Sequence, residues 1–164
     1  MESLLFWTFA VITLAGGVGV VVARNPVNGA MSLVGSFFAL AGLFLLLDAQ
    51  LIAVLQILVY AGAIMVLFLF VIMLLNLGPR DLGPPRFGVG KVVGVLAVGA
   101  TVASLLKVVL HVGRTPSPPI GAGFGTVASV GRLIYQQYTL PFEVVSLLLL
   151  TAIVAAVVVA KGRI

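Results

Sequence analysis

The sequence predicts an all-α integral membrane protein with about five transmembrane helices. Of its 164 residues, 62% are hydrophobic and only 8% are charged, and the mean hydropathy is +1.33. A soluble domain could not shield that much apolar surface from water, so lipid must be the solvent for most of the chain. The charged residues stand mainly at the ends of long apolar runs, which is the pattern of membrane spans.

Apolar runs long enough to cross a bilayer recur along the chain and are separated by Pro, Gly or charged residues. A helix needs about 20 apolar residues to cross the hydrocarbon core. We therefore expect a single membrane domain over residues 1–164, with spans at about 4–22, 27–47, 51–77, 91–112 and 141–160.

The basic residues divide unevenly between the two ends of these spans. Six lie on the side of the C-terminus and three on the other side, which also holds Glu2, Asp48 and Glu143. Because Lys and Arg are enriched in cytoplasmic loops, we expect the N-terminus outside and the C-terminus in the cytoplasm. In a soluble protein a pI near 10.3 would suggest nucleic acid, but here the bases indicate topology, and no nucleic-acid partner is expected.

The third span carries polar residues at membrane depth. Gln56 and Tyr60 are four residues apart, so an α-helix would place them on one face. A tyrosine hydroxyl near the middle of a span needs a hydrogen-bond partner or water. Tyr60 could be satisfied by a neighbouring helix and be structural, or it could belong with Gln56 to a proton path.

Gly62 stands between Ala61 and Ala63 in the same span. Glycine weakens a helix locally, and it suits either close packing or a π-bulge. As an α-helix, residues 51–77 would reach about 40 Å, against a hydrocarbon core of about 30 Å. A π-bulge or a tilt of the helix would take up the excess.

Small residues on the second span predict close helix packing. Ser32, Gly35, Ser36, Ala39 and Gly42 recur at helical spacing and form one smooth stripe. The stripe fits a helix of this chain or a helix of a partner.

No catalytic constellation is visible in the sequence. Asp48 in a short turn and Glu143 in the first turn of the last span are expected to cap helices or face the interface, and are weaker candidates for a proton path. The chain has no cysteine, which excludes iron–sulfur clusters and thiolate metal sites. Its one histidine, His111, cannot build a zinc or haem site alone.

The segment between the last two spans begins with glycines. Residues 121–125 read Gly-Ala-Gly-Phe-Gly, a spacing that does not match the nucleotide-binding GxGxxG pattern, and we expect a flexible loop. Val127, Val130 and Ile134 then predict a short helix that lies at the membrane interface.

Two segments together resemble a known family. Residues 56–76, with the run Tyr-x-Gly-Ala-x-x-Val-Leu-Phe-Leu-Phe-Val, and residues 130–143, with Leu-Pro-Phe-Glu, are similar to the J-type membrane subunit of bacterial NADH:quinone oxidoreductase. That subunit is the counterpart of mitochondrial NADH dehydrogenase subunit 6. The number and order of the spans also match, so the resemblance covers essentially the whole chain.

The resemblance implies a place in respiratory complex I, in a bacterial cytoplasmic membrane. It implies that NADH, FMN, iron–sulfur clusters and quinone are bound by other subunits, so that this chain holds no cofactor and performs no redox chemistry. The implied partners are the quinone-binding membrane subunit, the small K-type subunit, neighbouring antiporter-like subunits and the lipid bilayer.

The resemblance also implies roles for residues of the third span. In the family this helix carries a π-bulge that is proposed to switch between π and α forms and to gate a water path. Carried over, Tyr60 is the hydroxyl at the bulge, flexibility comes from Gly62 and Ala63, and part of the hydrophobic gate comes from Met65 and Val66.

Two other functions fit parts of the sequence. J-type chains resemble segments of multisubunit cation/proton antiporters, but an antiporter is expected to place a carboxylate at mid-membrane, and the acids here lie at span ends. A purely structural scaffold is consistent with the small-residue stripes. Substitutions at Tyr60 and Gly62 that preserve assembly would separate gating from bracing.

Overall fold

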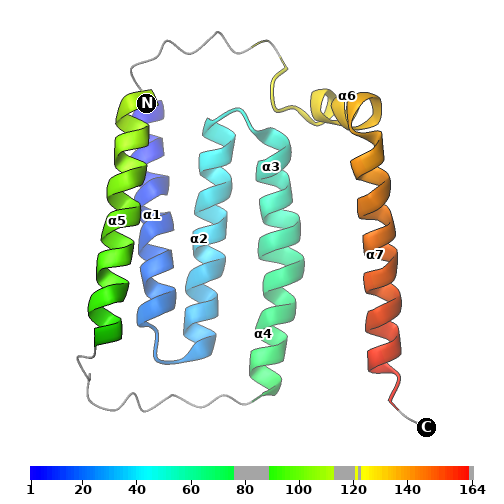
Figure 1. Ribbon diagram of the computed structural model, residues 1–164, viewed down its shortest axis with the longest axis horizontal. Coiled ribbons are helices and arrows are strands. Elements are labelled where there is room, and N and C mark those ends of the chain that lie inside the picture. The colour runs from blue at the N-terminus through cyan, green and yellow to red at the C-terminus, as the bar shows by residue number, and fades with distance from the viewer. Residues whose placement is uncertain (76–88, 113–120, 122, 163–164) are drawn as a thin grey trace. The chain divides into compact units, whose positions relative to one another are not determined.

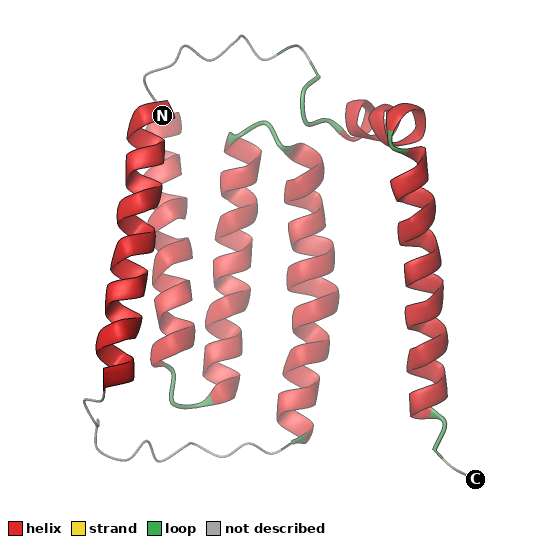
Figure 2. Cartoon of the chain, viewed as in Figure 1, coloured by secondary structure: helices red, strands yellow, loops and turns green. Residues whose placement is uncertain are grey.

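A computed structural model describes residues 1–75, 89–112, 121 and 123–162, and every regular element in them is a helix (Figures 1 and 2). The chain divides into two compact units, Met1–Leu77 with Ala122–Ile164, and Gly78–Gly121. The second unit contains α5, Val89–Val112. The first unit contains α1 (Glu2–Val22), α2 (Pro26–Leu46), α3 (Gln50–Leu55), the π-helix η1 (Gln56–Ile64), α4 (Met65–Leu74), α6 (Val127–Gln137) and α7 (Thr139–Ala160).

The predicted membrane class is confirmed by four helices that are long and apolar enough to cross a bilayer. They are α1, α2, the continuous helix Gln50–Leu74 formed by α3, η1 and α4, and α7. In α5 the apolar stretch that can be assessed runs from Leu96 to His111 and is shorter. The total of five spans, their orientation and the single membrane domain stay predictions.

The α1–α2 hairpin is the most closely packed part of the first unit. The Asn25 side chain caps α2 by accepting a hydrogen bond from the Val27 N–H at 2.9 Å. Ser36 Oγ donates to the Thr13 carbonyl of α1 at 2.9 Å. A Cβ added to Gly16 would lie only 2.8 Å from the Ser36 Cβ, so the two backbones approach closely because Gly16 has no side chain.

The predicted small-residue stripe of α2 accounts for much of this packing. Ser32, Ser36 and Gly42 meet Gly19, Gly16 and Phe9 of α1, respectively. Gly35, which the stripe was expected to include, does not contact α1. It is exposed, and no described residue lies within 4 Å of an added Cβ there.

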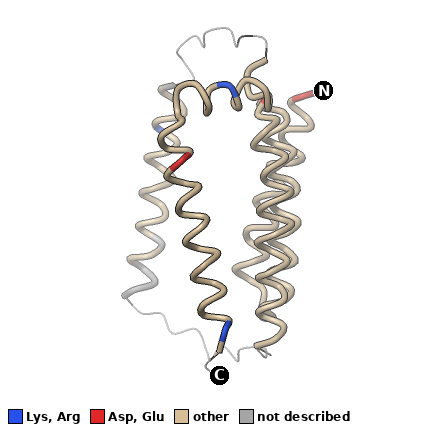
Figure 3. The backbone as a smooth tube through the Cα atoms, turned by 90° about the vertical axis from the view of Figure 1, so that its right-hand side faces the viewer, with Lys and Arg blue, Asp and Glu red and all other residues tan. Residues whose placement is uncertain are grey.

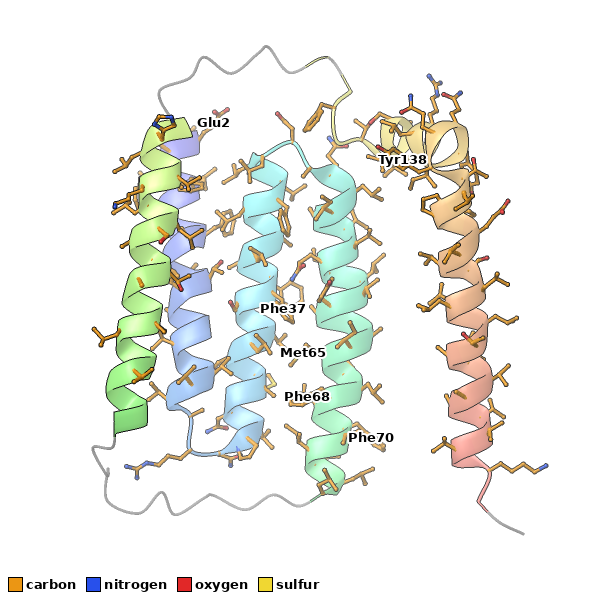
Figure 4. All side chains as sticks on the ribbon, viewed as in Figure 1. Glu2, Phe37, Met65, Phe68, Phe70 and Tyr138 are labelled. Carbon is orange, nitrogen blue, oxygen red and sulfur yellow. The ribbon has the colours of Figure 1, made fainter. Side chains whose placement is uncertain are left out.

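The opposite face of α2 packs against the third span. Met65 and Ile72 are buried against Ala30 of α2, and partly buried hydrophobic side chains surround them: Leu33, Val34, Phe37 and Leu69. In Figure 4, Phe37 and Met65 lie in this interface between α2 and the third span. Thus α2 packs against α1 on one side and against the third span on the other.

The predicted short helix is present as α6. Thr126 caps it, with its Oγ1 accepting from the Ser129 N–H at 3.3 Å. Only Tyr138 separates α6 from α7, and the helix axis turns sharply between them (Figure 1). Among the described helices α7 packs against α6 alone, and all of its residues are exposed.

Candidate functional site

The third span changes its hydrogen-bonding pattern halfway along its length. Residues Gln56–Ile64 form a π-helix, and the Met65 N–H that follows them bonds to the Tyr60 carbonyl five residues earlier. This confirms the predicted π-bulge. The π-helix is rare, occurs mostly inside α-helices and is frequent at functional sites.

The π segment changes which residues share a face. The buried positions of this span are Ala53, Gln56, Ala61, Met65 and Ile72, so the step from Gln56 to Ala61 is five residues. The expectation that Gln56 and Tyr60 share a face stays a prediction, but in this register the next buried position after Gln56 is Ala61 and not Tyr60. Gln56 is 6% exposed, whereas Tyr60 is 48% exposed.

Tyr60 sits close to the middle of the span. Its ring packs edge-on against Phe37 of α2, with the ring centroids 5.9 Å apart and the planes at 73°. Its hydroxyl forms no hydrogen bond to any residue that the structure describes. A hydroxyl at this depth therefore needs water or a group from a neighbouring chain.

Gln56 stands at the start of the π segment and faces inward. Its side-chain amide forms no hydrogen bond within the described part of the chain. No buried side-chain nitrogen or oxygen in that part is both fully occluded and unpaired, so the amide keeps some accessible surface. Gln56 is thus a buried polar group that can still meet a water molecule.

Gly62 suits the π geometry. A Cβ at this position would lie 3.2 Å from the Ile57 carbonyl oxygen of the preceding turn, which is tighter than an ordinary contact. Glycine therefore avoids a tight contact, which in this register any other residue would relieve only by a small shift of the Ile57 carbonyl. The neighbouring Ala63 is exposed.

The two predicted gate residues lie in different environments. Met65 is 3% exposed and belongs to the interface with α2, whereas Val66 is 61% exposed. Of these two residues, only Met65 lies between α2 and the third span in this register. Its flexible thioether side chain can adapt to a change of neighbours more easily than a β-branched residue can.

The weaker polar candidates lie at helix ends. Asp48 is exposed in the turn between α2 and α3 and has a positive φ of 56°. The prediction that Glu143 lies in the first turn of its helix is wrong, because α7 begins at Thr139 and accommodates Pro141 within its first turn. The charged residues of the four long apolar helices all lie near helix ends, as Figure 3 shows for their backbone positions.

One contact was not expected from the sequence. The Gly125 carbonyl accepts a hydrogen bond from the Leu51 N–H at 3.2 Å, so the segment before α6 lies on the turn between α2 and α3. The glycine-rich loop was predicted, but not its docking site. The repeated glycines were the only signal, and they do not specify a partner.

No metal site is found where the structure can be assessed. The described residues contain no group of three or more His, Cys, Asp or Glu side chains that could hold an ion. A cavity of about 300 Å³ lies between the start of α1 and the end of α2, and none of its lining residues belongs to η1.

Comparison with known sequences gives the family. Residues 16–159 match the profile of NADH-ubiquinone/plastoquinone oxidoreductase chain 6. The chain belongs to this family. The match includes η1, α6 and nearly all of α7, so it contains both segments on which the resemblance was based.

Individual relatives align with nearly all of this chain and with 80% or more of their own length. NADH-quinone oxidoreductase subunit J of Pseudomonas aeruginosa is 38% identical over 95% of this chain and 94% of its own. NAD(P)H-quinone oxidoreductase chain 6 of a Nostoc species is 36% identical over 98% of this chain and 80% of its own. F(420)H(2) dehydrogenase subunit J of Methanosarcina mazei is 32% identical over 99% of this chain and 93% of its own.

Proposed function

We propose that this chain is a membrane subunit of a proton-pumping NADH:quinone oxidoreductase, and that its third span couples quinone reduction to proton translocation by changing register at η1. Membership of the chain 6 family supports the first part. The second part rests mainly on one observation: a π segment holds a tyrosine hydroxyl, unpaired among the described residues, at the middle of a span.

The proposed change is a conversion of η1 from π to α hydrogen bonding. Conversion removes the inserted residue from the turn and rotates one half of the span relative to the other by about 100°. Counting from Gln56 in an α-helix, Tyr60 then takes the inward place that Ala61 holds in the π form. In the same way Ile64 replaces Met65 against α2.

This exchange has a direct chemical consequence. In the α form the Tyr60 hydroxyl and the Gln56 amide share one face, and both can bond the same short chain of water molecules. In the π form Ala61 is the buried residue at that level, and Tyr60 is about half exposed. A hydrogen-bonded proton path through this face is thus complete in one register and interrupted in the other.

The redox steps belong to other subunits in this proposal. The printed names of the relatives specify three electron donors, NADH, NAD(P)H and F(420)H(2), although each relative aligns with at least 95% of this chain. Such variation is expected of a subunit that does not touch the donor. Flavin, iron–sulfur clusters and quinone would likewise be held by partner chains.

The proposed setting is a bacterial cytoplasmic membrane, with α5 as the fifth span and the N-terminus outside. The quinone-binding, K-type and antiporter-like subunits are the proposed neighbours. The exposed apolar surface of α7 supports a requirement for such neighbours or for lipid, because water would not tolerate it.

The test is the Tyr60→Phe variant in the assembled enzyme, with protons translocated per electron measured in sealed vesicles. We expect quinone reduction to continue while proton translocation falls, because the ring still packs against Phe37 but the hydroxyl is gone. Tyr135→Phe, on the exposed surface of α6, is the matched control. An assembled Tyr60→Phe enzyme that pumps like the parent would favour the structural-scaffold function instead.

A further inference from the structure

The start of the third span is held by a short segment from a distant part of the chain. Leu51 is the second residue of α3, so its N–H has no acceptor within the helix. The Gly125 carbonyl accepts from it at 3.2 Å. We call residues Gly123–Gly125 the strap.

Sterics make this contact specific to glycine. Gly125 has a φ of 70°, and an added Cβ would overlap the Asp48 carbonyl oxygen and lie 3.1 Å from the Ala49 Cα. Both of those neighbours are backbone atoms, which cannot move aside as a flexible side chain can. Asp48 itself has a positive φ of 56°, so the strap and the turn it touches each adopt a demanding backbone conformation.

The two halves of the third span are held differently. The α3 half is tied by the strap, which continues through Thr126 into α6 and α7. Among the described contacts the α4 half has only side-chain packing against α2, through Met65 and Ile72. Apolar packing has no fixed direction, whereas a backbone hydrogen bond in a steric notch does.

We propose that the strap is a positioning element that fixes the α3 half, so that a change of register at η1 rotates the α4 half. The proposal rests on the register change proposed above, and it adds which half of the span rotates. With α3 fixed, Met65 leaves the α2 interface and Ala53 stays buried. Without the strap, both halves are held only by apolar packing against α2, and the rotation is shared between them.

Single cysteine substitutions test this, because the chain has no native cysteine. Ala53→Cys reports on α3 and Met65→Cys on α4, since the two parent residues are 1% and 3% exposed. Each is placed in the assembled enzyme and alkylated with a small membrane-permeable reagent, at rest and during turnover. Mass spectrometry of this chain then measures the fraction that carries the label.

With the strap intact, turnover is expected to raise labelling of Met65→Cys and to leave Ala53→Cys protected. Adding Gly125→Ala is expected to reduce the increase at Met65→Cys and to produce one at Ala53→Cys. Gly123→Ala is the matched control: Gly123 also has a positive φ, 89°, but among the described residues the one atom near its added Cβ is Thr126 Oγ1 at 4.0 Å. It strains the backbone without touching α3.

If Gly125→Ala does not assemble, Leu51→Pro serves instead. Proline is tolerated in the first turn of a helix, and it removes the N–H that donates to the Gly125 carbonyl. If turnover raises the labelling of Met65→Cys equally with and without a strap substitution, the strap proposal alone is overturned. Labelling at Met65→Cys that never depends on turnover would overturn the register change, and this inference with it.

Discussion

The α1–α2 hairpin and the third span are both apolar helical structures, but they are packed in opposite ways. In the hairpin, glycine and serine bring two backbones together, and the Ser36–Thr13 hydrogen bond fixes a single register. In the third span, Met65 and other larger side chains contact α2, and the helix interrupts its own α pattern over nine residues. The first arrangement resists rotation, and we propose that the second permits it.

The largest effect is expected from breaking the fixed region. Gly16→Leu drives a side chain into Ser36 of α2, where even a Cβ would lie 2.8 Å away. Overpacking of this kind costs about 1–3 kcal/mol, so the hairpin should separate and the amount of assembled enzyme should fall. Native gel electrophoresis of membrane extracts measures this. Gly17→Leu is the control, since no described residue lies within 4 Å of an added Cβ there, and equal losses in both variants would contradict the close-packing explanation.

A smaller and different effect is expected from Gly62→Ala in the third span. Alanine favours a helix over glycine by roughly 0.5–1 kcal/mol, but in the π register its Cβ meets the Ile57 carbonyl at 3.2 Å. The substitution should therefore favour the α form, leave assembly intact and lower the protons translocated per electron.

The same measurement on Gly35→Ala sharpens this prediction. Gly35→Ala gains the same helix propensity, and no described residue lies within 4 Å of its Cβ. The protons translocated per electron should therefore equal those of the parent. If Gly62→Ala also pumps normally, the contact with Ile57 does not control the register.

The smallest effect is expected from Ser36→Ala. It removes the hydroxyl that donates to the Thr13 carbonyl, and a hydrogen bond between membrane helices contributes about 0.6 kcal/mol on average. A slight decrease in the thermal stability of the assembled enzyme should follow, with pumping unchanged. In the control Ser32→Ala the lost hydrogen bond runs within α2, to the Asn28 carbonyl, so no hydrogen bond between helices is removed. A larger decrease for Ser32→Ala would contradict the assignment.

Much of the fold could be predicted from the sequence, because apolar length and flanking charge decide where a helix can sit in a bilayer. The described ends of the spans lie within about two residues of the predictions, except that the third span ends at Leu74, three residues before its predicted end, and that α5 yields a shorter apolar stretch. Glu143 was misplaced because the sequence does not show that Pro141 stands inside the first turn.

The site was predicted in location but not in geometry. Gly62 and the family motif indicated the π-bulge, yet helical periodicity assumes a constant turn and so paired Gln56 with Tyr60. The docking of Gly125 on Asp48 depends on two residues far apart in the sequence, and no local pattern encodes that distance.

The central claim is that the third span has two registers, and cryo-electron microscopy of the assembled enzyme at rest and during turnover tests it most directly. We predict that the Met65 N–H bonds to the Tyr60 carbonyl in one state, as it does here, and to the Ala61 carbonyl in the other. Tyr60 should turn inward with that change. A π segment that keeps the Met65–Tyr60 hydrogen bond in every state would contradict the claim.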